Sequence, residues 1–377
     1  MRFLEQSEIR RMTLECTRVG GVNLSQGVCD TPVPPEVRRA AQAAIDEGVN
    51  TYTRYDGLAE LRTALAAKLE RYNGLEYDPE QSIVVTSGAT GAFYGACLGL
   101  FDPGDEAILF APYYGYHVDT LRALSVEPRF VTLDPPSWKF TREALDALVG
   151  ARTRAIVVNT PANPSGKVFS RDELEVIADL AVERDLFVIT DEIYEHFLYD
   201  GHVHTSPAAL PGMAERTITI SGLSKTFSIT GWRIGFSAST PRLARMLGTI
   251  NDLVYVCAPA PLQLGVARGL EVLGPVFYEA LLAEYTLKRD RICGALDRAG
   301  LTPYTPEGAY YVLADTSKLP GENSKQRAMH LLETTGVAAV PGEAFYPEGK
   351  GKTLARFCFA KTDVALDEAC RRLERLG

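Results

Sequence analysis

The chain has 377 residues, of which 46% are hydrophobic and 23% are charged, and its net charge is −9. This composition is typical of a folded protein with two or three domains, and the acidic balance without any basic run argues against a nucleic-acid partner. No apolar run approaches the about 18 residues of a membrane span, and the charged start lacks the apolar core of a signal peptide. The seven scattered cysteines show no metal-ligand spacing and are typical of reduced thiols. We therefore expect a cytoplasmic protein that binds neither membrane, nucleic acid nor metal.

The first predicted elements are two helices that follow an N-terminal arm of residues 1–35. Residues 34–48 begin with prolines and end at Gly48, a pattern that is typical of helix ends. Residues 58–74 form a second amphipathic pattern, which Gly74 closes.

Short β-branched and apolar runs then alternate with helical patterns such as residues 171–185. Both faces of these runs are apolar, as in buried parallel strands. The runs lie at residues 82–86, 106–110, 128–133, 154–158, 186–190, 217–221 and 233–238. The alternation predicts an α/β large domain over residues 36–275, with a mostly parallel, seven-stranded sheet covered by helices.

The pattern changes after about residue 275, where a smaller α+β domain is expected over residues 276–377. Its predicted elements are a long helix at 276–300, a strand at 309–315, a helix at 324–336, strands at 337–342 and 354–360, and a last helix. We expect this domain to pack with the N-terminal arm.

Polar motifs follow several predicted strands, at the edge where open α/β sheets bind ligands. Gly88, Ala89 and Thr90 follow the first strand and open a helix, whose N–H groups suit an anion. Asp191 follows another strand, where its carboxylate could pair with a cationic ring nitrogen. Asn163 lies in a proline-rich turn and could donate to a ring substituent. Taken singly, the Gly88 and Asn163 segments fit an ordinary helix cap and an ordinary turn better, and Asp191 fits a cap equally well.

Three cationic side chains add to this pattern. Lys225 is the only lysine in a stretch of 120 residues and lies in a loop of hydroxyls and glycines. A desolvated lysine there has a lowered pKa and can act as a nucleophile, although most lysines are solvated. Arg233 is expected inside an apolar strand and would need an anion, such as a phosphate or a protein carboxylate. Strand alternation puts Arg356 among small side chains, with room for a bidentate carboxylate ligand or a salt bridge.

One ligand explains all these groups together. They comprise an amine nucleophile, a carboxylate for a ring nitrogen, an amide and a phenol for a ring oxygen, an anion site with an arginine, and a second arginine. Pyridoxal 5′-phosphate with an amino-acid substrate requires this set.

The chain resembles the class I and II aminotransferases of the aspartate aminotransferase fold, pyridoxal-phosphate fold type I, over nearly its whole length. The motifs that carry the resemblance are NLSQGVCDTP (23–32), YTRYDGLAELR (52–62), APYYGY (111–116), NTPANPSG (159–166), TDEIYEHF (190–197) and SGLSKTFSITGWRIGF (221–236). Two C-terminal stretches, GAYYVLAD and ARFCFAK, are most similar to the kynurenine and glutamine–phenylpyruvate branch, and the aspartate and aromatic aminotransferases are also similar. This hints at aromatic, methionine or glutamine substrates.

The resemblance implies a role for each matched ring-binding residue. Lys225 would be the Schiff-base lysine and the proton carrier, and Asp191 would keep the pyridine nitrogen protonated. Tyr194 and Asn163 would hydrogen-bond the ring oxygen, and Tyr114 would stack on the ring.

Further roles concern the phosphate and the substrate. The phosphate would be held by Arg233, the backbone of Gly88 and Ala89, and Thr90. Tyr52 would reach the phosphate of a partner subunit, which implies a homodimer with shared sites. Arg356, Asn163 and the backbone at Gly27 would hold the substrate α-carboxylate.

The sequence departs from the family at one position. Many relatives have a phosphate-binding serine three residues before the lysine, where this chain has Gly222, and either Ser221 or Ser224 could serve instead. No second arginine for a distal carboxylate is evident.

The implied function is transfer of an amino group from an L-amino acid to a 2-oxo acid in a ping-pong cycle (EC 2.6.1.-). A pyridoxal-phosphate-dependent β-lyase or another reaction at the same site is the alternative. A further alternative is a non-catalytic sensor, as in transcription regulators that contain an aminotransferase-like domain, although those regulators carry a DNA-binding module ahead of it.

Overall fold

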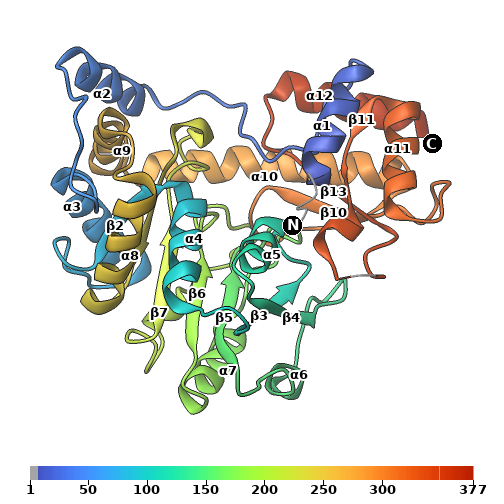
Figure 1. Cartoon of the computed structure of the whole chain (residues 1–377). Coiled ribbons are helices and arrows are strands. Elements are labelled where there is room, and N and C mark those ends of the chain that lie inside the picture. The colour runs from blue at the N-terminus through green and yellow to red at the C-terminus, as the bar shows by residue number, and fades with distance from the viewer. Residues whose placement is uncertain (1–6, 348, 377) are drawn as a thin grey trace.

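The computed structural model describes residues 7–347 and 349–376. Its largest sheet has seven strands, and Figure 1 shows how helices surround it. In spatial order the strands are β2 (Ile83–Ser87), β8 (Ile234–Ala238), β7 (Thr217–Ser221), β6 (Phe187–Asp191), β5 (Thr153–Asn159), β3 (Glu106–Ala111) and β4 (Glu127–Thr132). Strand β8 runs antiparallel to both of its neighbours, and the other six strands of this sheet all run in one direction. The predicted α/β class with a mostly parallel seven-stranded sheet is therefore confirmed.

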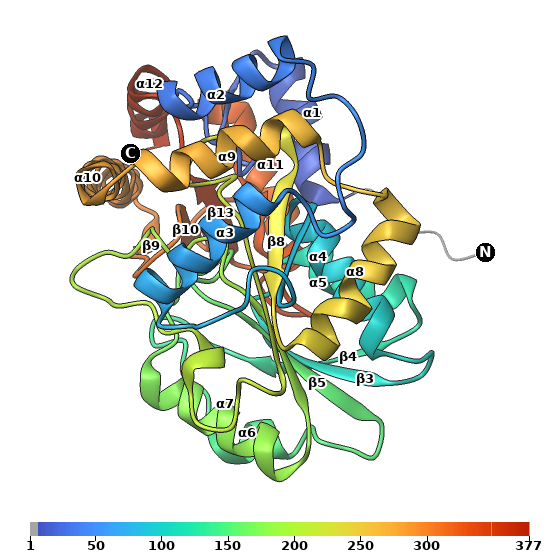
Figure 2. The same cartoon turned by 90° about the vertical axis from the view of Figure 1, so that its left-hand side faces the viewer.

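Helices cover the sheet on both faces, because its strands are apolar on both faces (Figure 2). On β2, Val84 belongs to one buried apolar cluster, whereas Ile83 and Val85 belong to another. The helices around this sheet are α2 (Pro35–Asp46), α3 (Ala59–Lys68), α4 (Gly88–Leu100), α5 (Gly115–Ala123), α6 (Arg142–Asp146), α7 (Arg171–Glu183), α8 (Pro241–Tyr255) and α9 (Ala260–Val272).

The C-terminal part forms a second, four-stranded antiparallel sheet. Its order is β12 (Val340–Pro341), β13 (Leu354–Cys358), β10 (Tyr311–Asp315) and β9 (Thr302–Tyr304). Its helices are α10 (Pro275–Arg298), α11 (Ser324–Thr335) and α12 (Asp363–Leu373).

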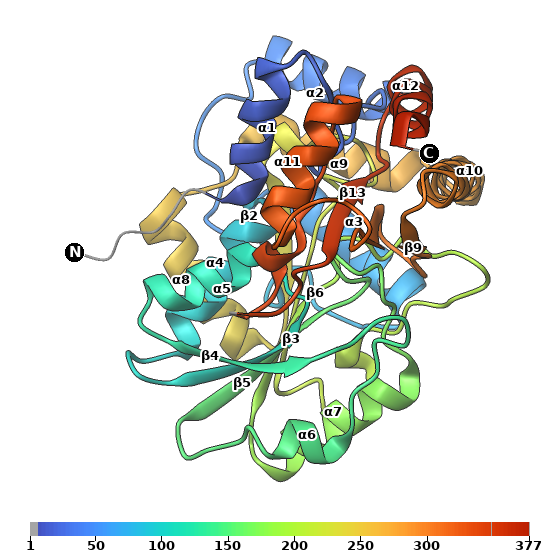
Figure 3. The same ribbon diagram turned by 90° about the vertical axis from the view of Figure 1, so that its right-hand side faces the viewer.

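The N-terminal segment packs on this C-terminal part. Helix α1 (Glu8–Arg18) lies beside α11 in Figures 1 and 3. Strand β1 (Val22–Asn23) pairs in parallel with β11 (Val337–Ala338). Met12 and Cys16 of α1 share a buried cluster with Ala328 and Leu332 of α11, so apolar burial fixes the contact.

Two predictions about local structure were wrong in detail, those for residues 337–342 and for Arg233. The expected strand 337–342 is divided, because β11 pairs with β1 while β12 pairs with β13 in the other sheet. The expected helix 58–74 does end at Gly74, although its last turn, Leu69–Asn73, is π-helical; Lys68, just before this turn, donates through Nζ to Asn73 Oδ1 at 2.9 Å. Arg233 precedes β8 rather than lying within it.

The remaining elements are short helical turns at Pro207–Ala209, Thr230–Trp232, Gly342–Phe345 and Glu374–Leu376. Across residues 7–347 and 349–376, no helix is long and apolar enough to cross a membrane.

Candidate active site

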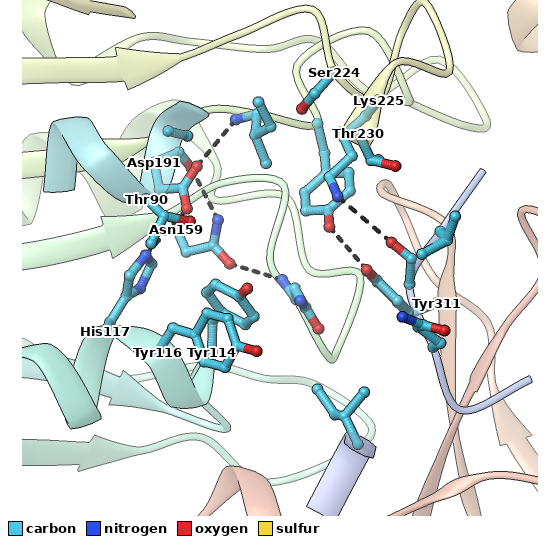
Figure 4. A pocket seen from close by; sticks show the side chains of 18 of the residues that line it. Thr90, Tyr114, Tyr116, His117, Asn159, Asp191, Ser224, Lys225, Thr230 and Tyr311 are labelled. Carbon is cyan, nitrogen blue, oxygen red and sulfur yellow. Dashed lines mark hydrogen bonds and ion pairs between the residues drawn. The ribbon is translucent and has the colours of Figure 1, made fainter. Parts of the chain in front are cut away.

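The site lies where the carboxyl ends of the parallel strands meet. Asn159 ends β5, Asp191 ends β6, and these two residues are direct neighbours in the sheet. Ser87 ends β2 opposite Ile234, the first residue of β8. A cavity of about 800 Å³ opens beyond this edge, and the N-terminal arm and β10 close its other side (Figure 4).

Lys225 reaches into the cavity from the loop after β7. Its Nζ lies 3.5 Å from the carbonyl oxygen of Gly27, in the N-terminal arm. Burial lowers the pKa of Lys225, because the ammonium loses hydration that the cavity does not replace. The neutral amine, which is nucleophilic and basic, is therefore more populated than in a solvated lysine.

Asp191 is the only carboxylate among the described residues that line the cavity. Its Oδ2 lies 3.1 Å from His117 Nε2, and its Oδ1 accepts from the backbone N–H of Ile193 at 3.3 Å. Asn159 Nδ2 donates to the Asp191 backbone carbonyl, and Asn159 Oδ1 accepts from Asn163 N–H. These contacts fix both Asp191 and the turn that carries Asn163.

Two tyrosines meet opposite Lys225. The hydroxyl oxygens of Tyr194 and Tyr311 lie 2.9 Å apart, and burial raises the pKa of each phenol, so both stay protonated as donors. Gly27 passes so close to Tyr311 that a Cβ would lie 2.0 Å from its hydroxyl oxygen. A glycine is therefore required for the arm to approach the cavity.

Arg356 points from β13 into the cavity and is 1% exposed. Its Nη1 donates to Asn163 Oδ1 at 2.9 Å, and its Nη2 donates to the Ser25 carbonyl oxygen at 2.5 Å. The guanidinium lies over the rings of Tyr311 and Phe345. Its buried Nε has no partner among the described residues, so the guanidinium has an unused donor.

The opposite end of the cavity suits an anion. Helix α4 begins at Gly88, directly after β2, so its first N–H groups face the cavity edge that Ala89 and Thr90 line. A Cβ on Gly235 of β8 would lie 2.3 Å from Ala89 N, which shows how closely β8 packs on this turn.

Arg233 lies at the same end, but in a different environment from the one expected. It is exposed and precedes β8, in a left-handed conformation with φ 58°. Its guanidinium donates only to the backbone carbonyls of Thr230 and Ser87, and no carboxylate among the described residues pairs with it. The expectation of a buried guanidinium was wrong, because the chain turns before the strand begins. The cation nevertheless faces the cavity without an anion.

The two candidate serines differ in position. Ser224 lines the cavity, whereas Ser221 is buried behind it and donates to Glu195 Oε1 at 2.8 Å. A Cβ on Gly222 would lie 3.0 Å from Gly235 Cα, so β8 leaves little space for a serine there.

Most candidate residues from the sequence meet in this cavity. Those that line it are Gly27, Ala89, Thr90, Tyr114, Asn163, Asp191, Tyr194, Ser224, Lys225, Arg233 and Arg356. Gly88 lies just behind, where a Cβ would meet Arg233 Nη2 at 2.6 Å. Tyr52 is 82% exposed and lies outside the cavity of its own chain.

Sequence reasoning missed several lining residues. They are Arg10, Thr13, His117, Asn159, Thr230 and Tyr311. His117 could have been suspected, because it lies one residue beyond the matched APYYGY motif. Arg10 could not, because only the packing of α1 on the C-terminal part brings it to the cavity.

These residues fit pyridoxal phosphate. An amine with a lowered pKa, a fixed carboxylate and an unpaired arginine beside a helix start match its aldehyde, ring nitrogen and phosphate. The unused donor of Arg356 matches a substrate carboxylate.

Comparisons with known proteins agree with this geometry. The sequence model of the family described as Aminotransferase class I and II matches residues 19–373. A probable N-succinyldiaminopimelate aminotransferase from Mycobacterium tuberculosis is 40% identical, over 97% of this chain and 95% of that protein. Kynurenine–oxoglutarate transaminase 3 from Rattus norvegicus is 35% identical, over 92% of this chain and 83% of that protein. The solved structure of N-succinyldiaminopimelate aminotransferase from M. tuberculosis superposes with a TM-score of 0.95. The two sequences are 39% identical, and the match covers 99% of this chain and 97% of that chain.

Proposed function

The chain belongs to the class I and II aminotransferases, and from this premise we propose which of its residues carry the reaction. The enzyme depends on pyridoxal phosphate and transfers an amino group from an amino acid to a 2-oxo acid. One observation carries the assignment of roles: Lys225, Asp191, Arg233 and Arg356 converge on one cavity from three separate strand ends and the C-terminal sheet.

The cofactor end is assigned first. Lys225 binds the cofactor covalently, and Asp191, held by His117, keeps a proton on the ring nitrogen. Tyr194 and the Nδ2 of Asn163 donate to the ring oxygen, and Tyr114 covers the ring. A buried carboxylate beside a pyridinium is stable as a pair, whereas either charge alone would be costly.

The phosphate is assigned to the anion site. Arg233, the N–H groups at Gly88 and Ala89, and the hydroxyl of Thr90 bind it. Ser224 supplies a further hydroxyl, because it lines the cavity and the Ser221 hydroxyl is engaged with Glu195.

When bound, pyridoxal phosphate supplies an electrophilic carbon for the amino group and a protonated ring that accepts electrons from the broken bond. Arg356 and the backbone at Gly27 bind the substrate α-carboxylate, which orients the Cα–H bond toward Lys225. The Nζ of Lys225 would be freed when the substrate amino group takes its place. It would then accept the Cα proton and deliver it to the cofactor carbon that carries the amino group, a task that its lowered pKa favours.

The assembly is proposed to be a homodimer with shared sites. Large apolar side chains are exposed around α8, including Tyr52, Leu253, Tyr255 and Val256. Such a patch is typical of an interface. The hydroxyl of Tyr52 would then reach the phosphate bound by the partner subunit.

The proposed domain limits are 1–35 for the arm, 36–275 for the large domain and 276–377 for the small one. The separate sheets of the two parts support this division. We further propose a cytoplasmic location, which the seven free cysteines support.

The assignment of Lys225 is tested by replacing it. Lys225→Ala should reduce turnover by about 10³-fold or more, because both covalent attachment and the base are lost. Borohydride reduction and peptide mass mapping should place the cofactor on the Lys225 peptide in the wild type only.

Lys318→Ala, which removes an exposed lysine, is the matched control and should behave as the wild type. Product analysis separates reaction types, since a lyase would release ammonia and pyruvate instead of exchanging amino groups with a 2-oxo acid. Near-normal transamination by Lys225→Ala would refute the assignment.

A further inference from the structure

Cations outnumber carboxylates among the side chains that line the cavity, and the proposed roles leave one of these cations without a function. Apart from His117, the charged side chains that line it are the cations of Arg10, Lys225, Arg233 and Arg356 and the single carboxylate of Asp191. The proposed roles use three of the four cations, for covalent attachment, the phosphate and the α-carboxylate. The cation of Arg10 is left over.

Helix α1 carries Arg10 to the substrate end of the cavity. Thr13, one helical turn or about 5 Å farther along α1, also lines the cavity. The Thr13 hydroxyl lies 3.4 Å from Ser25 Oγ, and the Ser25 carbonyl accepts from Arg356. The face of α1 that presents Arg10 is therefore connected to the residues that hold Arg356.

The Arg10 guanidinium has no protein partner in the described part of the chain. Other arginines of α1 do, since Arg11 pairs with Glu8 at 3.0 Å and Arg18 pairs with Glu15 at 2.8 Å. Arg10 has no ion pair or side-chain hydrogen bond within residues 7–347 and 349–376, and it is exposed toward the cavity mouth. An unpaired guanidinium there suits a carboxylate, which can accept two parallel hydrogen bonds.

We propose that Arg10 binds the distal carboxylate of a dicarboxylic amino acid and of the matching 2-oxo diacid, while Arg356 binds the α-carboxylate. The inference rests on the proposed function, because Arg356 defines which carboxylate is the α-carboxylate. Arg10 is then a specificity-determining residue, a second arginine for a distal carboxylate that was not evident in the sequence.

Neutral substrates are compatible with this arrangement. The cavity lining also includes the aromatic side chains of Phe93, Tyr114 and Tyr116, which suit an apolar or aromatic substrate side chain. Arg10 stays hydrated at the mouth when such a substrate binds, so an unpaired cation costs little there. One site would thus accept a bulky neutral amino acid and a dicarboxylic partner in alternate halves of the cycle.

The kinetic test compares glutamate with glutamine, which differ in the charge of the distal group. Arg10→Gln in the holoenzyme should lower kcat/KM for the glutamate half-reaction about tenfold and change that for glutamine less than about twofold. Arg11→Gln is the matched control, because it removes the same charge from the same helix but outside the cavity lining. It should leave both values unchanged.

A binding test avoids turnover altogether. Glutarate has two carboxylates but no amino or keto group, whereas pentanoate has one carboxylate on the same carbon chain. Calorimetry on the holoenzyme should show that Arg10→Gln raises the Kd of glutarate about tenfold and leaves that of pentanoate unchanged.

The outcomes separate this inference from the proposed function. Arg356→Lys should lower kcat/KM for glutamate and for glutamine alike. If it lowers neither value, the proposed α-carboxylate site is wrong, whatever result the Arg10 variant gives. An equal loss for glutamate and glutamine in Arg10→Gln, or an unchanged value for glutamate, would overturn the role of Arg10. So would a wild-type enzyme that neither reacts with glutamate nor binds glutarate more tightly than pentanoate.

Discussion

At the scale of single residues, burial decides which side chains of this protein carry charge. Lys225 shows this at the active site, where lost hydration lowers its pKa. A second example lies behind the site, where Glu195 contacts Lys68 and accepts from Ser221 and Asn73. Burial alone would raise the pKa of Glu195, but the attraction of Lys68 and of His196 and His204, together with the Lys68 hydrogen bond, outweighs it and lowers the pKa to about 2.

His196 shows the opposite case, a buried group that stays neutral. Its ring lies between those of Tyr72 and Tyr278, with centroids 4.4 and 4.6 Å away. Burial lowers the pKa of His196 to about 3, against the opposing attraction of Glu195. Since an unfolded histidine has a pKa of about 6.5, the unfolded chain binds one more proton between these values. Stability is therefore complete above about pH 6.5 and falls as the pH falls toward 3.

We expect His196→Phe to remove this dependence while keeping the ring stack. Between pH 7 and pH 5 the free energy of unfolding of the wild type should fall by about 2 kcal/mol relative to the variant. Denaturant titrations at both pH values measure the difference. His202→Phe, at an exposed position, is the control, and its free energy of unfolding should fall with pH as much as that of the wild type.

At the scale of elements, the anion site depends on how β8 packs on the turn between β2 and α4. Gly235 lies opposite Thr86 in the sheet, and its missing side chain leaves space for the Gly88–Ala89 peptide. The sequence pattern predicted both strands and the helix, but it gave no indication that β8 inserts between β2 and β7 in the antiparallel direction. That insertion brings Arg233 to the helix start.

Gly235→Ala should disturb this turn, because a Cβ would lie 2.3 Å from Ala89 N and from Gly88 C. We expect the dissociation constant of pyridoxal phosphate to rise about tenfold or more, as measured by fluorescence titration of the apoenzyme. Gly95→Ala on α4 is the control, because its Cβ would meet Leu247 at an ordinary 3.6 Å. It should bind the cofactor normally and be slightly more stable. Equal cofactor affinity in both variants would contradict the proposed phosphate site.

At the scale of the whole molecule, several exposed apolar side chains gather at the end of α8. Leu253 is 82% exposed on α8, and Val256, which ends this helix with φ 63°, is 40% exposed. The neighbouring loop packs on α8 through Tyr55, whose carbonyl accepts from Asn251 Nδ2 at 2.6 Å. A strained, apolar and exposed surface beside the anion site supports the proposed dimer interface.

Leu253→Glu should therefore shift the protein from dimer to monomer and weaken cofactor retention, because Tyr52 of the other subunit would be lost from the site. Analytical ultracentrifugation and the absorbance of bound cofactor after gel filtration measure both effects. Leu287→Glu, at a position that is 65% exposed on α10, is the matched control. A Leu253→Glu protein that remains dimeric would place the interface elsewhere.

The sequence by itself determined the strands of the large sheet, most helices and the groups at the sheet edge. Their signals are local, since apolar periodicity predicts an element and a polar residue directly after a strand lies at its carboxyl end. Asp191, Asn163 and Lys225 could therefore be named from the sequence. Only the tertiary structure decided the strand order, the division of residues 337–342, the partner of Asp191 and the positions of Tyr311 and Arg10. Each of these depends on contacts between segments that are distant in the chain, and local residue patterns carry little information about such contacts.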